Sequence, residues 1–108
     1  MKSADLFMDL VATYRKYGWE LRSVLLQPET RAVLDNAQLL DKVSVKEASF
    51  DALWFSRPSH NNREAWELRL LSQIQYALFE AFEPDETEEE REDVKLEMEA
   101  RMRDYCHR

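Results

Sequence analysis

Apolar residues near the N-terminus recur every three or four positions, which predicts an amphipathic helix from Ser3 to about Tyr17. Ser3 can cap the N-terminus of this helix. Gly18, the only glycine in the chain, stands where a left-handed residue would end it. The expected core face of this helix comprises Leu6, Phe7, Leu10, Val11, Tyr14 and Tyr17.

The next segment, Trp19 to Leu26, alternates between apolar and charged residues at its start, which predicts a half-buried strand. Pro28 then fits the first position of a short helix with the sequence PETRAVLDN. The segment Val43 to Ala48 fits either a short strand or an irregular approach to the next strand.

The segment Phe50 to Ser56 is apolar at both odd and even positions. This pattern is typical of a strand that is covered on both faces, or of one whose outer face stays apolar and exposed. The residues that follow, RPSHNN, are rich in turn formers. We expect Leu53 and Phe55 on the outer face, between neighbours that carry charged side chains.

Residues 63–71, REAWELRLL, alternate in polarity and predict a second strand; a helix is the alternative. We favour the strand because Ser72 and Gln75 form a capping box, which places a helix start at Ser72. That helix would end by Glu83. Its predicted core face is Ile74, Ala77, Leu78, Ala81 and Phe82, with Tyr76 and Phe79 directed elsewhere.

A second capping box, Thr87 with Glu90, predicts a C-terminal helix that runs to about Tyr105. Its narrow apolar stripe could pack on the domain or on a second chain; the stripe is Val94, Met98, Met102 and Tyr105. The tetrapeptide WELR occurs at Trp19 and again at Trp66. A duplicated strand–helix unit and a chance repeat of a strand pattern both explain the two copies.

The predicted fold class is α+β: a small, mostly antiparallel sheet of about three strands, covered on one face by helices. The chain length indicates a single domain, 1–108, with a core at 1–83 and an acidic C-terminal helix at 84–108. We expect the three tryptophans on one face of the sheet.

The net charge of −7 lies entirely in the segment Glu83 to Glu97, which holds nine acids and two bases; outside it acids and bases are equal in number. This charge disfavours nucleic acids and anionic membranes as partners. No apolar run approaches the roughly 20 residues that span a bilayer, and a signal peptide is not evident. With one cysteine, Cys106, we expect a cytoplasmic protein.

The sequence lacks the residues that several kinds of catalytic or binding site require. A single glycine excludes the phosphate-cradling P-loop and the dinucleotide fingerprint. His60, Cys106 and His107 do not have the spacing of a zinc site. A thiol at a helix C-terminus is a poor nucleophile, because the helix dipole raises its pKa. We therefore expect no cofactor, no metal and no enzymatic activity.

The leading hypothesis is a non-enzymatic protein–protein interaction module that self-associates. The alternative is an inhibitor or immunity-type protein that blocks a basic partner with the acidic segment 83–97; a small enzyme with a cleft around His60 is a third possibility. The candidate partner-binding residues are Leu53, Phe55, Tyr76, Phe79, Glu88, Glu89, Glu92, Met98 and Met102.

Overall fold

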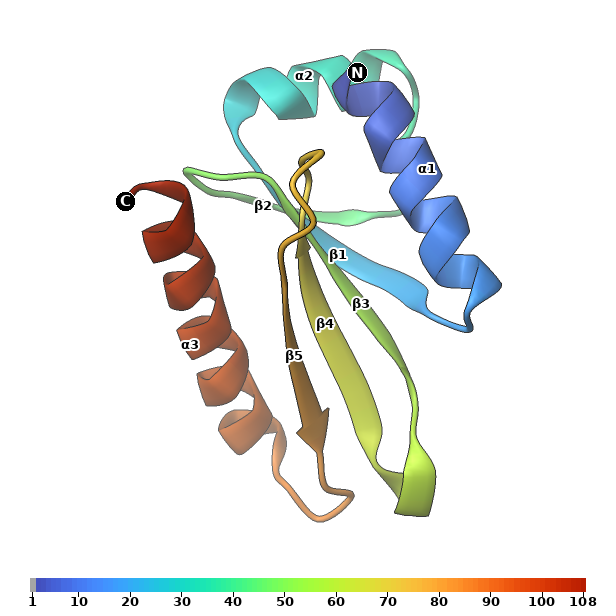
Figure 1. Ribbon diagram of the computed structural model, residues 1–108, viewed down its shortest axis with the longest axis vertical. Coiled ribbons are helices and arrows are strands. Elements are labelled where there is room, and N and C mark those ends of the chain that lie inside the picture. The colour runs from blue at the N-terminus through green and yellow to red at the C-terminus, as the bar shows by residue number, and fades with distance from the viewer. Residues whose placement is uncertain (1) are drawn as a thin grey trace.

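A five-stranded sheet in the order β2-β1-β3-β4-β5 forms the centre of the computed structural model, which describes residues 2–108 (Figure 1). The strands are β1 (Glu20–Leu26), β2 (Ser44–Glu47), β3 (Ala52–Pro58), β4 (Glu64–Leu70) and β5 (Ala77–Phe82). The helices are α1 (Ser3–Lys16), α2 (Pro28–Asn36) and α3 (Glu88–Cys106), with a short 3-10 turn, η1 (His60–Asn62), between β3 and β4.

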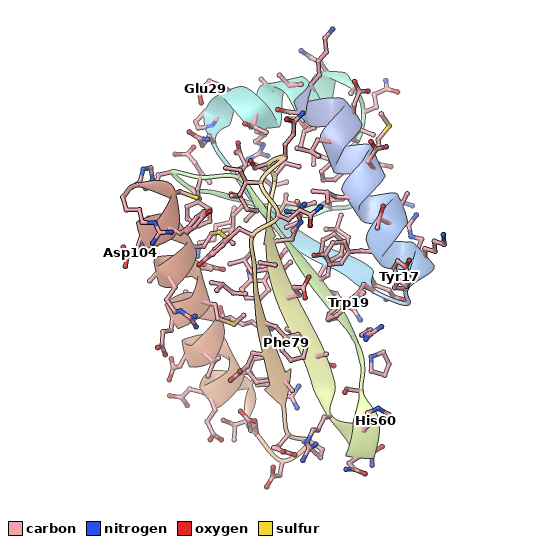
Figure 2. The ribbon with its side chains drawn as sticks, viewed as in Figure 1. Tyr17, Trp19, Glu29, His60, Phe79 and Asp104 are labelled. Carbon is pink, nitrogen blue, oxygen red and sulfur yellow. The ribbon has the colours of Figure 1, made fainter. Side chains whose placement is uncertain are left out.

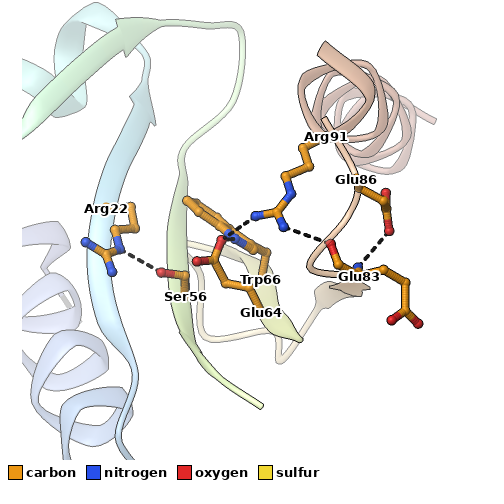
Figure 3. Close-up of polar contacts among 7 residues, drawn as sticks. All are labelled: Arg22, Ser56, Glu64, Trp66, Glu83, Glu86 and Arg91. Carbon is orange, nitrogen blue, oxygen red and sulfur yellow. Dashed lines mark hydrogen bonds and ion pairs between the residues drawn. The ribbon is translucent and has the colours of Figure 1, made fainter. Parts of the chain in front are cut away.

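The sheet is mixed. β1 and β2 are parallel and are connected through α2, whereas β3 pairs antiparallel with β1 and β4, and β5 pairs antiparallel with β4. The register shifts between Leu21 and Ser23 of β1. At this shift the Arg22 Nε donates to the Ser56 hydroxyl oxygen at 2.6 Å, so that a buried hydroxyl has a partner (Figure 3).

The prediction of an α+β class is confirmed, but the prediction of about three strands covered on one face is wrong. The segment Val43 to Ala48, whose sequence fits either a strand or an irregular approach, contains the short strand β2, and β5 replaces the helix expected from Ser72. The Ser72 hydroxyl accepts the N–H of Ile74 at 3.1 Å, and the Leu70 N–H donates to the Tyr76 carbonyl at 3.0 Å. These bonds turn the chain into a β4–β5 hairpin instead of starting a helix.

Two hydrophobic cores lie on opposite faces of the sheet. The first, beneath α1 and α2, includes Phe7, Leu34, Leu53 and Phe55. The second lies beneath α3 and includes Trp54, Leu68, Met98 and Met102.

Because both faces carry helices, Leu53 and Phe55 have no exposed surface (0%), and the expectation that they lie on an open face is wrong. The tryptophans also divide between the faces. Trp19 belongs to the first core and Trp54 to the second, with Trp66 packed against it.

The helix boundaries largely follow the sequence signals. α1 ends just before Gly18, which has the predicted left-handed conformation with φ of 88°. The cap position of α1 is Lys2, without a side-chain hydrogen bond, so the prediction that Ser3 caps it is wrong. α2 begins at Pro28 as predicted.

The C-terminal helix α3 packs on the domain, which is one of the two arrangements that its apolar stripe allowed. The predicted capping box forms: the Glu90 N–H donates to the Thr87 hydroxyl, and the Thr87 N–H donates to the Glu90 carboxylate, both at 3.1 Å. The hydrogen bond from the Thr87 N–H to the Glu90 carboxylate, and next the Thr87 side chain, hold the pKa of Glu90 below its usual value. Met98 and Met102 are buried against the sheet.

A polar cluster fastens the first turn of α3 to the end of the β4–β5 hairpin (Figure 3). Arg91 donates to the Glu64 carboxylate at 3.2 Å and to the Glu83 carbonyl at 2.8 Å. The Glu83 N–H in turn donates to the Glu86 carboxylate at 2.8 Å. Glu64 also accepts the indole N–H of Trp66, so one carboxylate joins β4 to α3.

Candidate interaction surface

The outer edge of β5 is an unpaired strand edge. β5 pairs only with β4, and α3 packs on one face of the sheet. Among the hydrogen bonds of residues 2–108, none reaches the side of β5 that faces away from β4. An open edge of this kind presents main-chain donors and acceptors that another strand can pair with.

The direction of the main-chain groups along β5 follows from one hydrogen bond. The Tyr76 carbonyl accepts the N–H of Leu70 and therefore points toward β4. Successive residues of a strand direct their N–H and C=O groups to opposite sides. Ala77, Phe79 and Ala81 therefore direct these groups to the free edge.

The side chains of Ala77, Phe79 and Ala81 lie on the face of the sheet that α1 only partly covers. Phe79 lies opposite Glu67 of β4, and Glu67 lies opposite Phe55, which is in the first core. α1 and α2 cover the β1–β3 part of this face, and the β5 part stays open: Phe79 is 58% exposed. The result is an aromatic side chain beside an unpaired edge.

Other apolar side chains around this region are also exposed. Tyr17 is 62% exposed at the end of α1, and Ile74 is 59% exposed in the loop before β5. The Trp19 ring meets the edge of Phe79 with centroids 6.4 Å apart; these aromatic residues are labelled in Figure 2. Exposed aromatic groups beside an open strand edge are typical of contact surfaces.

The opposite edge of the sheet is protected. β2 has only four residues, and three of them are exposed and polar. Lys46 of β2 is held by Glu99 of α3 at 3.2 Å. A short, charged edge strand resists pairing with another strand, so β5 is the more favourable edge.

Between α1 and the open face lies a cavity of about 350 Å³, lined by Thr13, Tyr14, Tyr17, Trp19, Arg57 and Glu67. The Tyr14 hydroxyl donates to the Glu67 carboxylate, and the Tyr14 ring stacks on Phe55 with centroids 4.1 Å apart. The Arg57 guanidinium lies 4.7 Å from the centroid of the Trp19 ring and donates to the Tyr17 carbonyl. The charged groups of this cavity are therefore already engaged within the chain.

Burial raises the pKa of the Tyr14 hydroxyl, and the hydrogen bond to Glu67 and the charge of Glu67 raise it further; Arg69 opposes this shift. The phenol therefore stays protonated well above neutral pH. It serves as a donor that holds Glu67, and not as an acid–base group near neutral pH.

The outward surface of the first half of α3 is acidic. Glu88, Glu89 and Glu92 are exposed, as the sequence-based hypothesis of an acidic binding face requires. The two bases of this segment turn inward. The Arg91 side chain is 15% exposed, and the Lys95 ammonium lies 3.5 Å from the centroid of the Trp66 ring.

Burial lowers the pKa of Lys95, against the charges of Glu92, Glu88 and Glu64 that raise it. The base therefore contributes to the attachment of α3 to the sheet. The charges of Glu92 and Glu88 act on this base, so Lys95 offsets part of their charge, and the exposed surface of the segment remains net negative.

A cavity of about 580 Å³ lies between the ends of β3, β4 and α3. In it His107 Nε2 lies 3.0 Å from the Ser49 hydroxyl oxygen. The nearby Asp51 accepts the backbone N–H of Gln27 at 2.8 Å, the Gln27 amide at 3.2 Å and the Thr30 hydroxyl at 2.7 Å. Asp51 therefore caps α2, and the hydrogen bonds of the described chain give His107 no carboxylate partner.

Cys106 lines the same cavity and is partly buried. Burial raises the pKa of its thiol, and the charge of Asp51 raises it further. A thiol that stays protonated is a weak nucleophile. The predicted direction of this shift agrees with the structure, although burial and Asp51, and not the helix dipole, are its causes here.

Within residues 2–108, no group of three or more His, Cys, Asp or Glu side chains is placed to hold a metal ion. No helix in the same range has both the length and the apolarity to cross a membrane.

The structure divides the predicted partner-binding residues into three groups: exposed, buried and half-buried. Phe79, Glu88, Glu89 and Glu92 are exposed; Leu53, Phe55, Met98 and Met102 are buried. Tyr76 is half-buried because its ring stacks on Tyr105 with centroids 3.6 Å apart.

Sequence reasoning missed Ala77 and Ala81, which carry the free main-chain groups on each side of Phe79. It placed both alanines on the core face of a helix. Residues 77–82, ALFEAF, are apolar except for Glu80, so no alternation of apolar and polar positions marks the strand, and the apparent capping box at Ser72 favours the helix.

Comparisons with protein-family models, with curated proteins and with solved structures found no match for this chain.

Proposed function

We propose that this chain is a non-enzymatic protein–protein interaction module that self-associates through the open side of β5. The observation that carries the proposal is the combination of an unpaired strand edge with an exposed Phe79. Main-chain groups at a free edge and an adjacent apolar side chain are the two elements of strand-addition binding.

Three features support this proposal over the alternatives. The β5 edge is apolar except for Glu80, whereas β2 is short and charged. The charged groups of the cavity between α1 and the open face, Arg57 and Glu67, are engaged within the chain. At the cavity between the ends of β3, β4 and α3, Asp51 caps α2 and the Cys106 thiol is held protonated.

The test is the mass of the protein in solution, measured by light scattering or sedimentation across micromolar concentrations. The wild-type chain is expected to associate, and Phe79→Lys to shift the equilibrium to the monomer. Lysine is chosen because residue 79 lies opposite Glu67, so the substitution is compatible with the folded sheet. A wild-type chain that remains a monomer at the highest concentration would remove the proposal.

Met8→Lys is a matched control. Met8 is also an exposed apolar residue (46%), but it lies on α1, away from β5. This variant introduces the same charge and should associate like the wild-type chain. Equal loss of association in both variants would indicate a general effect of charge and not a role for Phe79.

A second candidate function is the blocking of a basic protein by the acidic surface of α3. It is favoured by one observation, the inward orientation of Arg91 and Lys95, which leaves an excess of acids on the outward surface of the helix. Binding of this kind would be fast and would weaken steeply as salt increases. Strand pairing through main-chain groups has no such dependence.

The two candidates can be separated in one experiment. A pull-down with the wild-type chain and with a variant in which Glu88, Glu89 and Glu92 are replaced by Gln should be run at low and physiological salt. Capture of a basic protein by the wild-type chain alone, lost at higher salt, would support the acidic surface. Identical capture by both chains at both salt concentrations would exclude it.

A further inference from the structure

The β5 residues whose main-chain groups point to the free edge are Ala77, Phe79 and Ala81, a set that reads the same in both directions. A two-fold interface requires one patch to match itself. We infer that the second copy adds its own β5 antiparallel to the first, with the two-fold axis at Phe79. This inference rests on the proposed self-association and specifies its geometry.

In this arrangement Phe79 lies opposite Phe79 of the second copy, and Ala77 lies opposite Ala81. All three pairs have main-chain groups that point to the free edge, so each pair exchanges two hydrogen bonds. Every outward N–H and C=O of the three residues is then satisfied. Alanines on both sides leave room for the two phenylalanine rings, which lie on the open face.

The alternative registers satisfy fewer groups. A shift of one residue would place inward-directed main-chain groups opposite outward-directed ones. A shift of two residues would move the two-fold axis to Leu78 or Glu80, because moving one strand by two positions moves the axis by one. The Phe79 register is therefore the one that uses the whole edge.

The position of α3 agrees with this axis. Tyr105 stacks on Tyr76 just before β5, and Arg91 lies over the Phe82 ring at its end, 5.6 Å from the centroid. The middle of α3 is therefore at the level of Phe79, as the run of α3 alongside β5 in Figure 1 illustrates. A two-fold axis at Phe79 places the two α3 helices antiparallel with their middles adjacent.

The register predicts a disulfide that only two different variants can make together. In a Cys106→Ser background, Ala77→Cys and Ala81→Cys are prepared separately. The Cα atoms of a hydrogen-bonded antiparallel pair lie about 5.5 Å apart, within the range of a disulfide. Identical positions are four residues out of register, roughly 13 Å apart, and cannot be bridged.

The variants are oxidised gently, alone and as an equal mixture, and are analysed on non-reducing gels. We expect a cross-linked dimer in the mixture, approaching about half of the protein because random mixing makes half the dimers heterotypic, and little in either variant alone. Equal cross-linking in a single variant, or none in a mixture that still associates by light scattering, would overturn the inferred register.

Proline provides an independent test of the main-chain contact. Ala81→Pro removes an N–H that points to the free edge, and a proline at such a position is tolerated in an edge strand. Association should weaken at least tenfold, whereas the control Ala81→Ser, which keeps the N–H and adds a single atom, should associate like the wild-type chain. Circular dichroism confirms the fold of both variants.

The two proposals fail differently. A chain that is monomeric at every concentration removes both the self-association and its geometry. A chain that associates normally despite Ala81→Pro, with Ala81→Pro correctly folded, retains self-association and loses the β5 pairing.

Discussion

The ring of Tyr105 stacks on the ring of Tyr76, with centroids 3.6 Å apart and an angle of 8° between the planes. This contact fastens the C-terminal end of α3 to the residue that precedes β5. Together with the Arg91 cluster at the other end of α3, it fixes the helix along the length of the hairpin.

Replacing Tyr105 with leucine should lower the free energy of unfolding by about 0.5–1.5 kcal/mol, because the stacked pair is lost while an apolar side chain remains. Tyr105→Phe keeps the ring and should be close to the wild-type chain. Urea unfolding, performed in the Phe79→Lys background so that association does not contribute, measures both. If leucine and phenylalanine behave alike, the stacking does not stabilise α3.

Tyr14 predicts a dependence of stability on alkaline pH. Its pKa is raised in the folded protein, so the stabilisation is complete below the unfolded pKa of about 10 and is lost as pH rises above it. The Tyr14→Phe variant should therefore lose less stability between pH 9 and 11 than the wild-type chain does. Parallel stability curves for the two chains over this window would contradict the assignment.

The capping box at the start of α3 gives a third prediction. Thr87→Ala removes the hydroxyl that accepts the Glu90 N–H and should cost about 1 kcal/mol in unfolding free energy. Thr13→Ala is the control, because Thr13 is exposed inside α1, where alanine is the better helix former. The unfolding temperature should fall for Thr87→Ala, and it should rise or stay unchanged for Thr13→Ala.

Gly18 tests the conformational requirement at the end of α1. A Cβ at this position would meet nothing within 4 Å, so the cost of Gly18→Ala is that of the backbone at φ of 88° alone. We expect a loss of about 1 kcal/mol for alanine and less for asparagine, which tolerates this region better. An alanine variant as stable as the wild-type chain would show that the turn can relax.

Truncation of Phe55 should cost much more stability than truncation of Phe79, although both are phenylalanines in neighbouring parts of one sheet. Phe55→Ala opens a cavity in the first core and should cost about 3–5 kcal/mol. Phe79→Ala removes a largely exposed ring and should change the stability of the monomer by less than about 1 kcal/mol. Chemical denaturation of the two variants measures this difference.

Much of the fold follows from local signals. The Gly18 stop, the Pro28 start and the Thr87 cap depend on residues within one turn of a helix terminus, and the structure has all three. The strand over residues 63–71 was also predicted, against the alternative of a helix.

The error at β5 has a physical cause. Leu78 and Phe82 are four residues apart, a spacing that places two side chains on one face of a helix and equally on one face of a strand. The segment could therefore satisfy either periodicity. In the structure the segment is a strand, and the hydrogen bond from the Leu70 N–H to the Tyr76 carbonyl closes the hairpin.

The error about Leu53 and Phe55 is of another kind. A strand that is apolar on both faces fits either double coverage or an exposed apolar face, and the sequence does not distinguish them. The number of strands distinguishes them: five strands are wide enough for α1 and α2 on one face and α3 on the other. The repeated WELR illustrates the same limit, because Trp19 and Trp66 end on opposite faces.

The order of elements along the chain has a consequence for biosynthesis. α3 follows all five strands, yet its Met98 and Met102 complete the core that contains Trp54 and Leu68. While the ribosome is still producing this segment, one whole side of the finished sheet is bare and open to unwanted contacts. Nascent chains that end before Met98 should consequently be bound by chaperones that recognise apolar surface, and should be released once the helix has been made.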